Sequence, residues 1–199
     1  MSEIKIDADA AREALKKLSP RIGLIIPGII VLAGVFTSYF TVPTDSVAVV
    51  LRFGKSQRIA KPGLNFKWPF WFETKEIVPV DRVLKMEFGY GTEDAKNLFQ
   101  HRPQEYYEEK SMITGDKNAA AVEWVIQYKI SNPEAYLFAV RNPEETMRDA
   151  AESVMREVVG DRTVDEVITI GRESIAGDAL LGLEKLVNRY ELGLKIESL

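Results

Sequence analysis

Residues 22–40 form an uncharged run, IGLIIPGIIVLAGVFTSYF, which limits the possible folds of this chain more than any other feature. As an α-helix, a run of nineteen residues would reach roughly 28 Å, close to the hydrocarbon thickness of a bilayer. A core helix of a soluble domain is rarely apolar on every face over such a length. The sequence therefore predicts a transmembrane helix over residues 22–41. The side chains expected to anchor it in lipid are Ile22, Ile26, Ile30, Phe36 and Phe40.

A cleaved signal peptide is the main alternative for this run. Signal peptides have a shorter apolar core that is followed by a cleavage site with small residues. Here the run is longer and continues into YFTVP, which has no such site. A retained anchor is the stronger interpretation.

The basic residues on either side of the run predict its orientation. Four of them lie within ten residues before it: Arg12, Lys16, Lys17 and Arg21. The first one after it is Arg52. Because the flank that is richer in Lys and Arg stays in the cytoplasm, residues 1–21 are expected to be a short cytoplasmic segment. The main domain is then expected on the far side of the membrane.

Composition excludes several classes of function. The chain has 199 residues, enough for one anchor and one domain with a real core. It has no cysteine, which rules out disulfides, thiolate zinc sites and cysteine nucleophiles. Its net charge of −4 comes without a basic stripe, so nucleic acid is not expected as a partner.

Nothing in the sequence indicates a catalytic, cofactor or metal site. There is no P-loop, GxGxxG or zincin motif. The single histidine, His101, lies in a polar stretch and has none of the His or Cys neighbours that a metal site needs. We therefore expect a protein that is not an enzyme. A membrane-anchored hydrolase that depends on His101 is the alternative from another class.

Patterns after residue 44 predict an α+β domain over residues 44–199, with an antiparallel sheet packed with helices. Alternating apolar residues, turns and edge prolines predict strands at 45–53, 57–60, 76–88 (a pair, or one strand bent at Pro79), 122–130 and 194–199. Capping boxes predict helices that begin after Asn142 and Thr163, and an apolar stripe predicts a third over 175–190. Residues 89–110 are polar and aperiodic, so they are expected to form a long loop or insertion.

One segment is unusually aromatic. Four of the five residues from 68 to 72 have aromatic rings: Trp68, Phe70, Trp71 and Phe72. Such a density soon after a membrane span is typical of a belt at the membrane interface. The alternative is an ordinary buried hairpin, but Pro69 argues against a central strand.

Several segments together resemble the SPFH family, which includes stomatins, prohibitins and the paired proteins HflK and HflC, with the HflK branch the nearer match. The first half of the resemblance lies in VVLRFGK (49–55), KPGLNFKWPF (61–70) and VPVDR (78–82). The second half lies in MITGDKN (112–118), in residues 122–160 and in TVDEVITIGRE (163–173). The resemblance covers about residues 44–199.

This resemblance implies a non-enzymatic scaffold in a bacterial inner membrane, with its SPFH domain in the periplasm. The implied partners are an HflC-like SPFH protein, with which it forms a hetero-oligomer, and an FtsH-type membrane protease whose access to substrates the assembly restrains. A stomatin- or prohibitin-like scaffold with a different client is the alternative. No cofactor is implied.

The C-terminal region departs from the family pattern. Such proteins continue past the SPFH domain into a long coiled coil, but no heptad run follows Gly193. The resemblance therefore implies either a piece truncated after the SPFH domain or a form without the helical wall.

Overall fold

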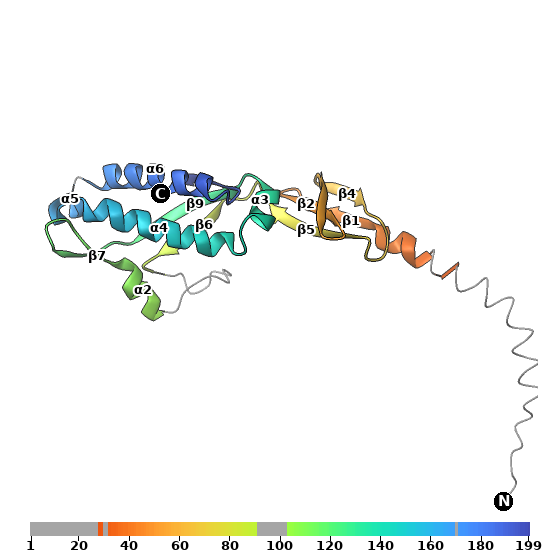
Figure 1. Ribbon diagram of the computed structural model, residues 1–199, viewed down its shortest axis with the longest axis horizontal. Coiled ribbons are helices and arrows are strands. Elements are labelled where there is room, and N and C mark those ends of the chain that lie inside the picture. The colour runs from red at the N-terminus through yellow and green to blue at the C-terminus, as the bar shows by residue number, and fades with distance from the viewer. Residues whose placement is uncertain (1–27, 30–31, 91–102, 170) are drawn as a thin grey trace, which may run out of the picture.

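The computed structural model describes residues 28–29, 32–90, 103–169 and 171–199. These residues form an elongated molecule: a short helix over residues 32–38 leads into a small β unit, and a larger α+β unit lies beyond it (Figure 1). The β unit contains β1 (Tyr39–Val42), β2 (Ser46–Arg52), β3 (Lys55–Ala60), β4 (Gly63–Phe66) and β5 (Glu73–Pro79).

The larger unit contains the remaining strands and the labelled helices. The strands are β6 (Leu84–Phe88), β7 (Ser111–Ile113), β8 (Ala119–Ala121), β9 (Trp124–Ile130) and β10 (Leu194–Ser198). The helices are α2 (Pro103–Lys110), α3 (Pro133–Phe138), α4 (Pro143–Gly160), α5 (Val164–Ile168) and α6 (Arg172–Arg189).

Strand β2 is the centre of the β unit. It pairs antiparallel with β3 on one side and β5 on the other, while β1 pairs antiparallel with β4. Residues Ala48 to Leu51 are all buried, so both faces of β2 are covered. One small cluster of buried side chains lies here: Phe40, Val42, Ala48, Val50 and Ala60.

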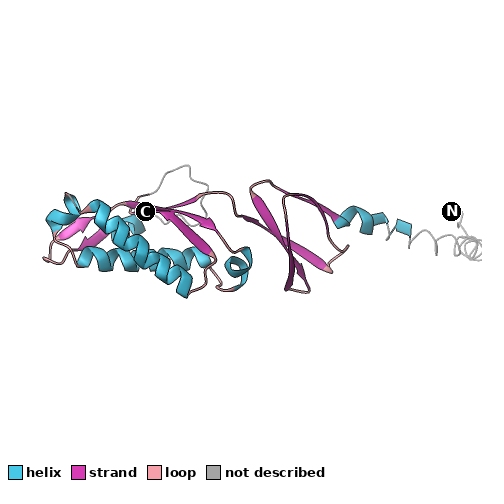
Figure 2. Ribbon diagram, turned by 90° about the horizontal axis from the view of Figure 1, so that it is seen from above, coloured by secondary structure: helices cyan, strands magenta, loops and turns pink. Residues whose placement is uncertain are grey.

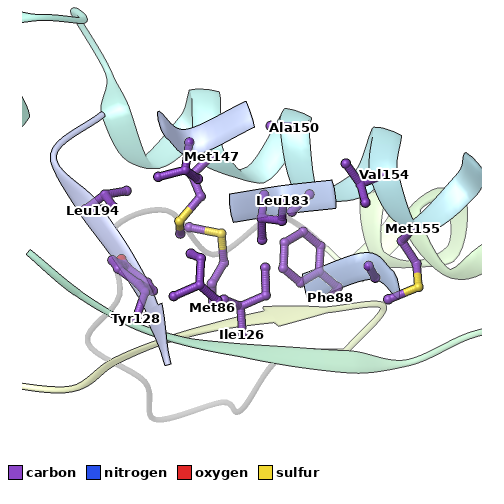
Figure 3. Close-up of a cluster of buried hydrophobic side chains, with 14 of the residues drawn as sticks. Met86, Phe88, Ile126, Tyr128, Met147, Ala150, Val154, Met155, Leu183 and Leu194 are labelled. Atoms are coloured by element: carbon purple, nitrogen blue, oxygen red, sulfur yellow. The ribbon is translucent and has the colours of Figure 1, made fainter. Parts of the chain in front are cut away.

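The α+β unit has a three-stranded antiparallel sheet in the order β10-β9-β6. Helices α4 and α6 lie side by side across one face of it (Figures 1 and 2). Their buried faces meet the sheet in the main core, where Met147 and Leu183 face Met86 and Ile126 (Figure 3). This core is far larger than the one in the β unit.

The expected α+β class is confirmed, with antiparallel sheets and helices. Strand β9 shows the alternating burial that its sequence predicts, and α4, α5 and α6 occupy the three predicted helical segments. The capping box at Thr163 is formed. At Asn142 it is not: the Asn142 amide donates to Glu145 Oε2 at 2.8 Å instead of accepting from the backbone.

The structure refines the elements expected at three places. Of the two alternatives for residues 76–88, the structure has two strands, the end of β5 and all of β6, and these belong to different sheets because β5 ends at Pro79 and the chain crosses to the second unit. Part of the expected loop at 89–110 is helix α2, which the aperiodic pattern did not indicate; residues 91–102, with His101, lie outside the described residues. Helix α3 was also not predicted.

The predicted transmembrane helix is only partly covered by the structure. Ile22, Ile26 and Ile30 lie outside the described residues, as does the expected cytoplasmic segment 1–21. A search of the described residues finds no helix that combines the length and apolarity needed to cross a bilayer. The described helix ends at residue 38, and Tyr39–Val42 pair with β4. The span over residues 22–41 stays a prediction.

Candidate membrane-interface site

The aromatic loop (residues 67–72) connects β4 to β5 at the end of the β unit that adjoins helix 32–38. All four predicted interface residues lie on it, and all are exposed. The exposed fractions are 58% for Trp68, 44% for Phe70, 92% for Trp71 and 51% for Phe72. An ordinary buried hairpin does not describe this loop. Its four aromatic rings are accessible to solvent. Folding alone does not favour such a cluster of exposed apolar side chains.

Two contacts hold the aromatic loop against the end of the uncharged run. The backbone N–H of Lys67 donates to the carbonyl of Ser38 at 2.7 Å. The ring of Phe70 packs so closely on the helix that a Cβ built on Gly34 would lie 3.5 Å from it. Phe70 itself has a φ of 59°, a conformation that non-glycine residues rarely adopt without support from packing. The loop is therefore held directly beside the segment predicted to enter lipid.

A buried carboxylate anchors the other side of the loop. Glu73, 2% exposed, accepts from Arg52 Nη2 at 2.7 Å and from the backbone N–H of Trp68 at 3.0 Å. Arg58 Nη2 lies 3.9 Å from its second oxygen. Burial raises the pKa of Glu73, but the Trp68 hydrogen bond and the two guanidinium groups outweigh it and hold the pKa below its usual value. One side chain thus links the loop to β2, β3 and β5.

The structure adds aromatic residues that sequence reasoning missed. Phe53 is 78% exposed and meets the ring of Phe72 edge to face at 5.8 Å; the sequence pattern had placed it at the end of the strand predicted over residues 45–53. Its φ of 51°, next to Gly54, places it in the turn between β2 and β3. The glycine at position 54 was the sequence signal for this turn. Tyr39 and Phe66 form a second exposed edge-to-face pair at 5.8 Å. Together these rings form the aromatic surface: Tyr39, Phe53, Phe66, Trp68, Phe70, Trp71 and Phe72.

The predicted anchor residues that the structure describes have different positions. Phe36 is 74% exposed on helix 32–38, in line with a lipid-facing role. Phe40 is buried in β1, within the small core of the β unit, and is not available to lipid in this fold. The helix-to-strand change at residue 39 causes this difference.

Other parts of the described chain offer no comparable chemical site. A groove of about 760 Å³ runs between β8, β9 and helices α4 to α6, and its walls are mainly apolar, with Arg172 among them. Within the described ranges no group of His, Cys, Asp and Glu could hold a metal ion. The buried pair Glu109–Arg148, 2.7 Å apart, joins α2 to α4 beside the edge strand β6 and has a structural role.

Comparison with known proteins finds one matching family and several similar proteins. The model of the SPFH domain / Band 7 family matches residues 40–198. The chain is 34% identical over 175 residues to Protein HflK of Borreliella burgdorferi and 37% identical over 158 residues to Protein HflK of Treponema pallidum. It is 31% identical over 180 residues to the Modulator of FtsH protease HflK of Escherichia coli.

These alignments cover most of this chain but only part of each relative. They take in 88%, 78% and 90% of this chain, and 54%, 47% and 38% of the three relatives in the same order. The chain therefore spans about half, or less, of the length of the relatives it matches.

Proposed function

The chain belongs to the SPFH domain / Band 7 family, as an HflK-type member, and on that premise we propose that it is a membrane-anchored scaffold that regulates an FtsH-type protease. The Escherichia coli relative is named as a modulator of that protease. Regulation of this kind needs no catalytic group in the scaffold. The proposed role is therefore non-enzymatic, as the absence of catalytic motifs in the sequence predicts.

The family match carries the proposed role, and the structural observation that supports the membrane anchoring is the aromatic loop beside the uncharged run. Trp and Tyr rings favour the headgroup region of a bilayer, where an apolar body and a polar edge are both accommodated. Trp71 is almost fully exposed, and Glu73 holds the start of its loop in place. In the proposal, residues 22–38 enter the inner membrane from the cytoplasm and the loop contacts the outer leaflet, with the SPFH domain in the periplasm.

The proposed mechanism is mechanical. Domains tethered in this way pack side by side with an HflC-like SPFH partner, and the resulting hetero-oligomer limits which membrane proteins reach the protease. A tether on one side and a second contact at the aromatic surface restrict each domain to one orientation. That restriction favours lateral assembly, because less rotational freedom is lost when neighbours associate. The alternative is a stomatin- or prohibitin-like scaffold that organises a different client.

Co-purification tests the protease role. The chain is extracted from native membranes in mild detergent, and its companions are identified by mass spectrometry. We expect an FtsH-type protease together with an HflC-like protein. Recovery of a different membrane protein, with the protease absent, would favour the alternative scaffold.

A fluorescence experiment tests the membrane contact. The chain has three tryptophans, of which Trp68 and Trp71 are exposed and Trp124 is buried in the α+β core. In vesicles that contain a brominated phosphatidylcholine, we expect bromine to quench the first two. Trp68→Phe with Trp71→Phe should leave only the weakly quenched Trp124. Equal quenching before and after the change would count against the contact.

A further inference from the structure

We propose that the aromatic surface binds anionic phospholipids in preference to neutral ones, through a basic patch formed by Arg52, Lys55, Arg58 and Lys67. This inference rests on the proposed membrane contact and names the lipid class that the contact selects. It draws on the charges behind the rings rather than on the rings themselves.

The β unit has the opposite charge balance to the rest of the chain. Residues 39–79 contain six Lys and Arg against three Asp and Glu, whereas the whole chain contains 26 against 30. The β unit therefore has a net positive charge, although the protein as a whole has a net negative charge. The excess lies in the unit that also contains the aromatic surface.

The four cations of the basic patch lie directly behind the exposed rings. The Arg52 guanidinium carbon is 5.8 Å from the centroid of the Trp68 ring, and Lys67 immediately precedes that residue. Lys55 follows the turn in which Phe53 packs on Phe72. Arg58 donates to the carbonyl of Phe66, so its guanidinium also lies at this end of the sheet.

Little negative charge offsets the patch. Two acids lie beside it. Glu73 is buried and pairs with Arg52 and Arg58, and Glu134 of α3 accepts a hydrogen bond from Ser56, the residue after Lys55. The side chains of those arginines remain 45% and 44% exposed, and Lys55 makes no ion pair with any residue that the structure describes. Asp45 is engaged with Arg82 at 2.6 Å, at the opposite end of β2. Two carboxylates therefore stand against four cations, which leaves the patch net positive.

Anionic lipid suits this arrangement better than another polyanion. Rings at headgroup depth bring the cations behind them to the level of the phosphates and the water layer just above. Each Lys or Arg close to an anionic membrane surface strengthens partitioning by about fivefold. A nucleic acid or an acidic protein would meet the cations only after covering seven exposed rings beside an uncharged segment. The charge and the apolar surface fit one partner, an anionic bilayer.

The test keeps lipid composition constant and moves only the label. The full chain is reconstituted in vesicles of phosphatidylcholine and phosphatidylglycerol, with bromine on the acyl chains of one lipid or the other at equal mole fraction. We expect brominated phosphatidylglycerol to quench Trp68 and Trp71 at least twofold more than brominated phosphatidylcholine. High salt should abolish the difference, because exposed charges are screened.

Matched charge variants identify the residues responsible. Lys55→Gln with Lys67→Gln should remove most of the preference for the anionic lipid while leaving total quenching in place. Lys61→Gln with Lys85→Gln makes the same change in net charge away from the patch, at the far end of β3 and on β6, and should leave the preference unchanged.

The outcomes separate the two proposals. Equal quenching by both brominated lipids, or a preference that survives in the Lys55 and Lys67 variant, overturns the anionic selectivity but leaves the membrane contact. Absence of quenching by either lipid overturns the contact and the selectivity together.

Discussion

At the residue scale, Glu73 connects the stability of the β unit to the shape of the aromatic loop. Glu73→Gln retains the size of the side chain but removes the charge that pairs with Arg52 at 2.7 Å. Because Arg52 is partly exposed and can be resolvated, we expect a loss of about 1–3 kcal/mol in the free energy of unfolding. Urea titration measures it. Glu76→Gln, on the exposed face of the same strand, is the control and should change stability by less than about 0.5 kcal/mol.

The lowered pKa of Glu73 also predicts a pH dependence. A carboxyl whose pKa is lower in the folded protein stabilises the fold at a pH above its unfolded pKa, and that contribution is lost as the pH falls through the folded pKa. We expect the loop to stay ordered at neutral pH and to loosen only in acid, as the pH falls below the usual pKa of a glutamate and through the lowered pKa of Glu73. Emission from Trp68 and Trp71 reports the change. A Glu73→Gln variant with an unchanged acid transition would contradict this assignment.

The buried Glu109–Arg148 pair predicts a larger effect. Arg148 Nη1 lies 2.7 Å from Glu109, Nη2 donates to the carbonyl of Glu87 at 3.1 Å, and the guanidinium carbon lies 4.7 Å from the Phe88 ring centroid. Arg148→Met leaves a buried carboxylate without its counter-charge, which typically costs about 3–5 kcal/mol. Thermal unfolding tests this.

Two further variants serve as controls for this pair: one removes both of its charges, and the other changes a neighbouring exposed residue. Arg148→Met with Glu109→Leu removes both charges and should recover much of the loss, because no isolated charge stays buried. Glu108→Gln, one residue away and exposed, should be nearly neutral. If the double variant is no more stable than Arg148→Met alone, the pair does not act as described.

At the scale of elements, α2 shows how a helix can form without an apolar stripe. Its sequence, PQEYYEEK, is strongly polar. Contacts from other elements hold it: Arg148 pairs with Glu109, Arg156 Nη2 donates to the carbonyl of Glu108 at 3.0 Å, and Lys110 pairs with Glu123 at 3.1 Å. Since most helical stability in proteins comes from tertiary contacts, periodicity alone did not reveal this helix.

Two glycines at α6 predict opposite responses to the same change. A Cβ added at Gly177 in the helix meets nothing within 4 Å, so Gly177→Ala should raise stability by about 0.5–1 kcal/mol through helix propensity. Gly193, between α6 and β10, has a φ of 68°, and a Cβ there would lie 2.4 Å from the carbonyl oxygen of Asn132. Gly193→Ala should lower stability by at least about 1–3 kcal/mol. Calorimetry of both variants checks the signs, and a stabilised Gly193→Ala would contradict the strained turn.

At the scale of the whole molecule, two cores of unequal size predict two levels of stability. The buried cluster of the β unit consists of five residues, whereas that of the α+β unit includes both long helices and a three-stranded sheet. Because opening free energy follows buried apolar contacts, we expect the β unit to open first. Native-state hydrogen exchange should show lower opening free energies for β2 and β3 than for β9. Equal values would mean that the two units unfold together.

Contact with the membrane is also expected to stabilise the folded state of the β unit. A surface that binds only the folded β unit shifts its equilibrium towards the folded state. Exchange protection of β2 and β3 should therefore increase in vesicles that contain anionic lipid. The α+β unit, which has its own core, should change little.

Local patterns were sufficient for much of this fold. The uncharged run, the alternation in β9, the capping box at Thr163 and the apolar stripes of α4 and α6 all depend on neighbours a few residues apart. They predicted the α+β class, most elements and the four exposed rings of the aromatic loop. The family resemblance, which a domain model over residues 40–198 supports, then supplied the proposed role.

Contacts across long separations required the tertiary structure. Glu73 meets Arg52 across 21 residues and Arg148 meets Glu109 across 39, and no local pattern marks either carboxylate as buried. The division of residues 76–88 between two sheets, the burial of Phe40 and the exposure of Phe53 likewise depend on which strands pair. Local sequence patterns show periodicity over one or two turns, whereas burial and ion pairing depend on contacts between residues far apart in the sequence. Such long-range contacts orient the aromatic surface and the cations of the basic patch.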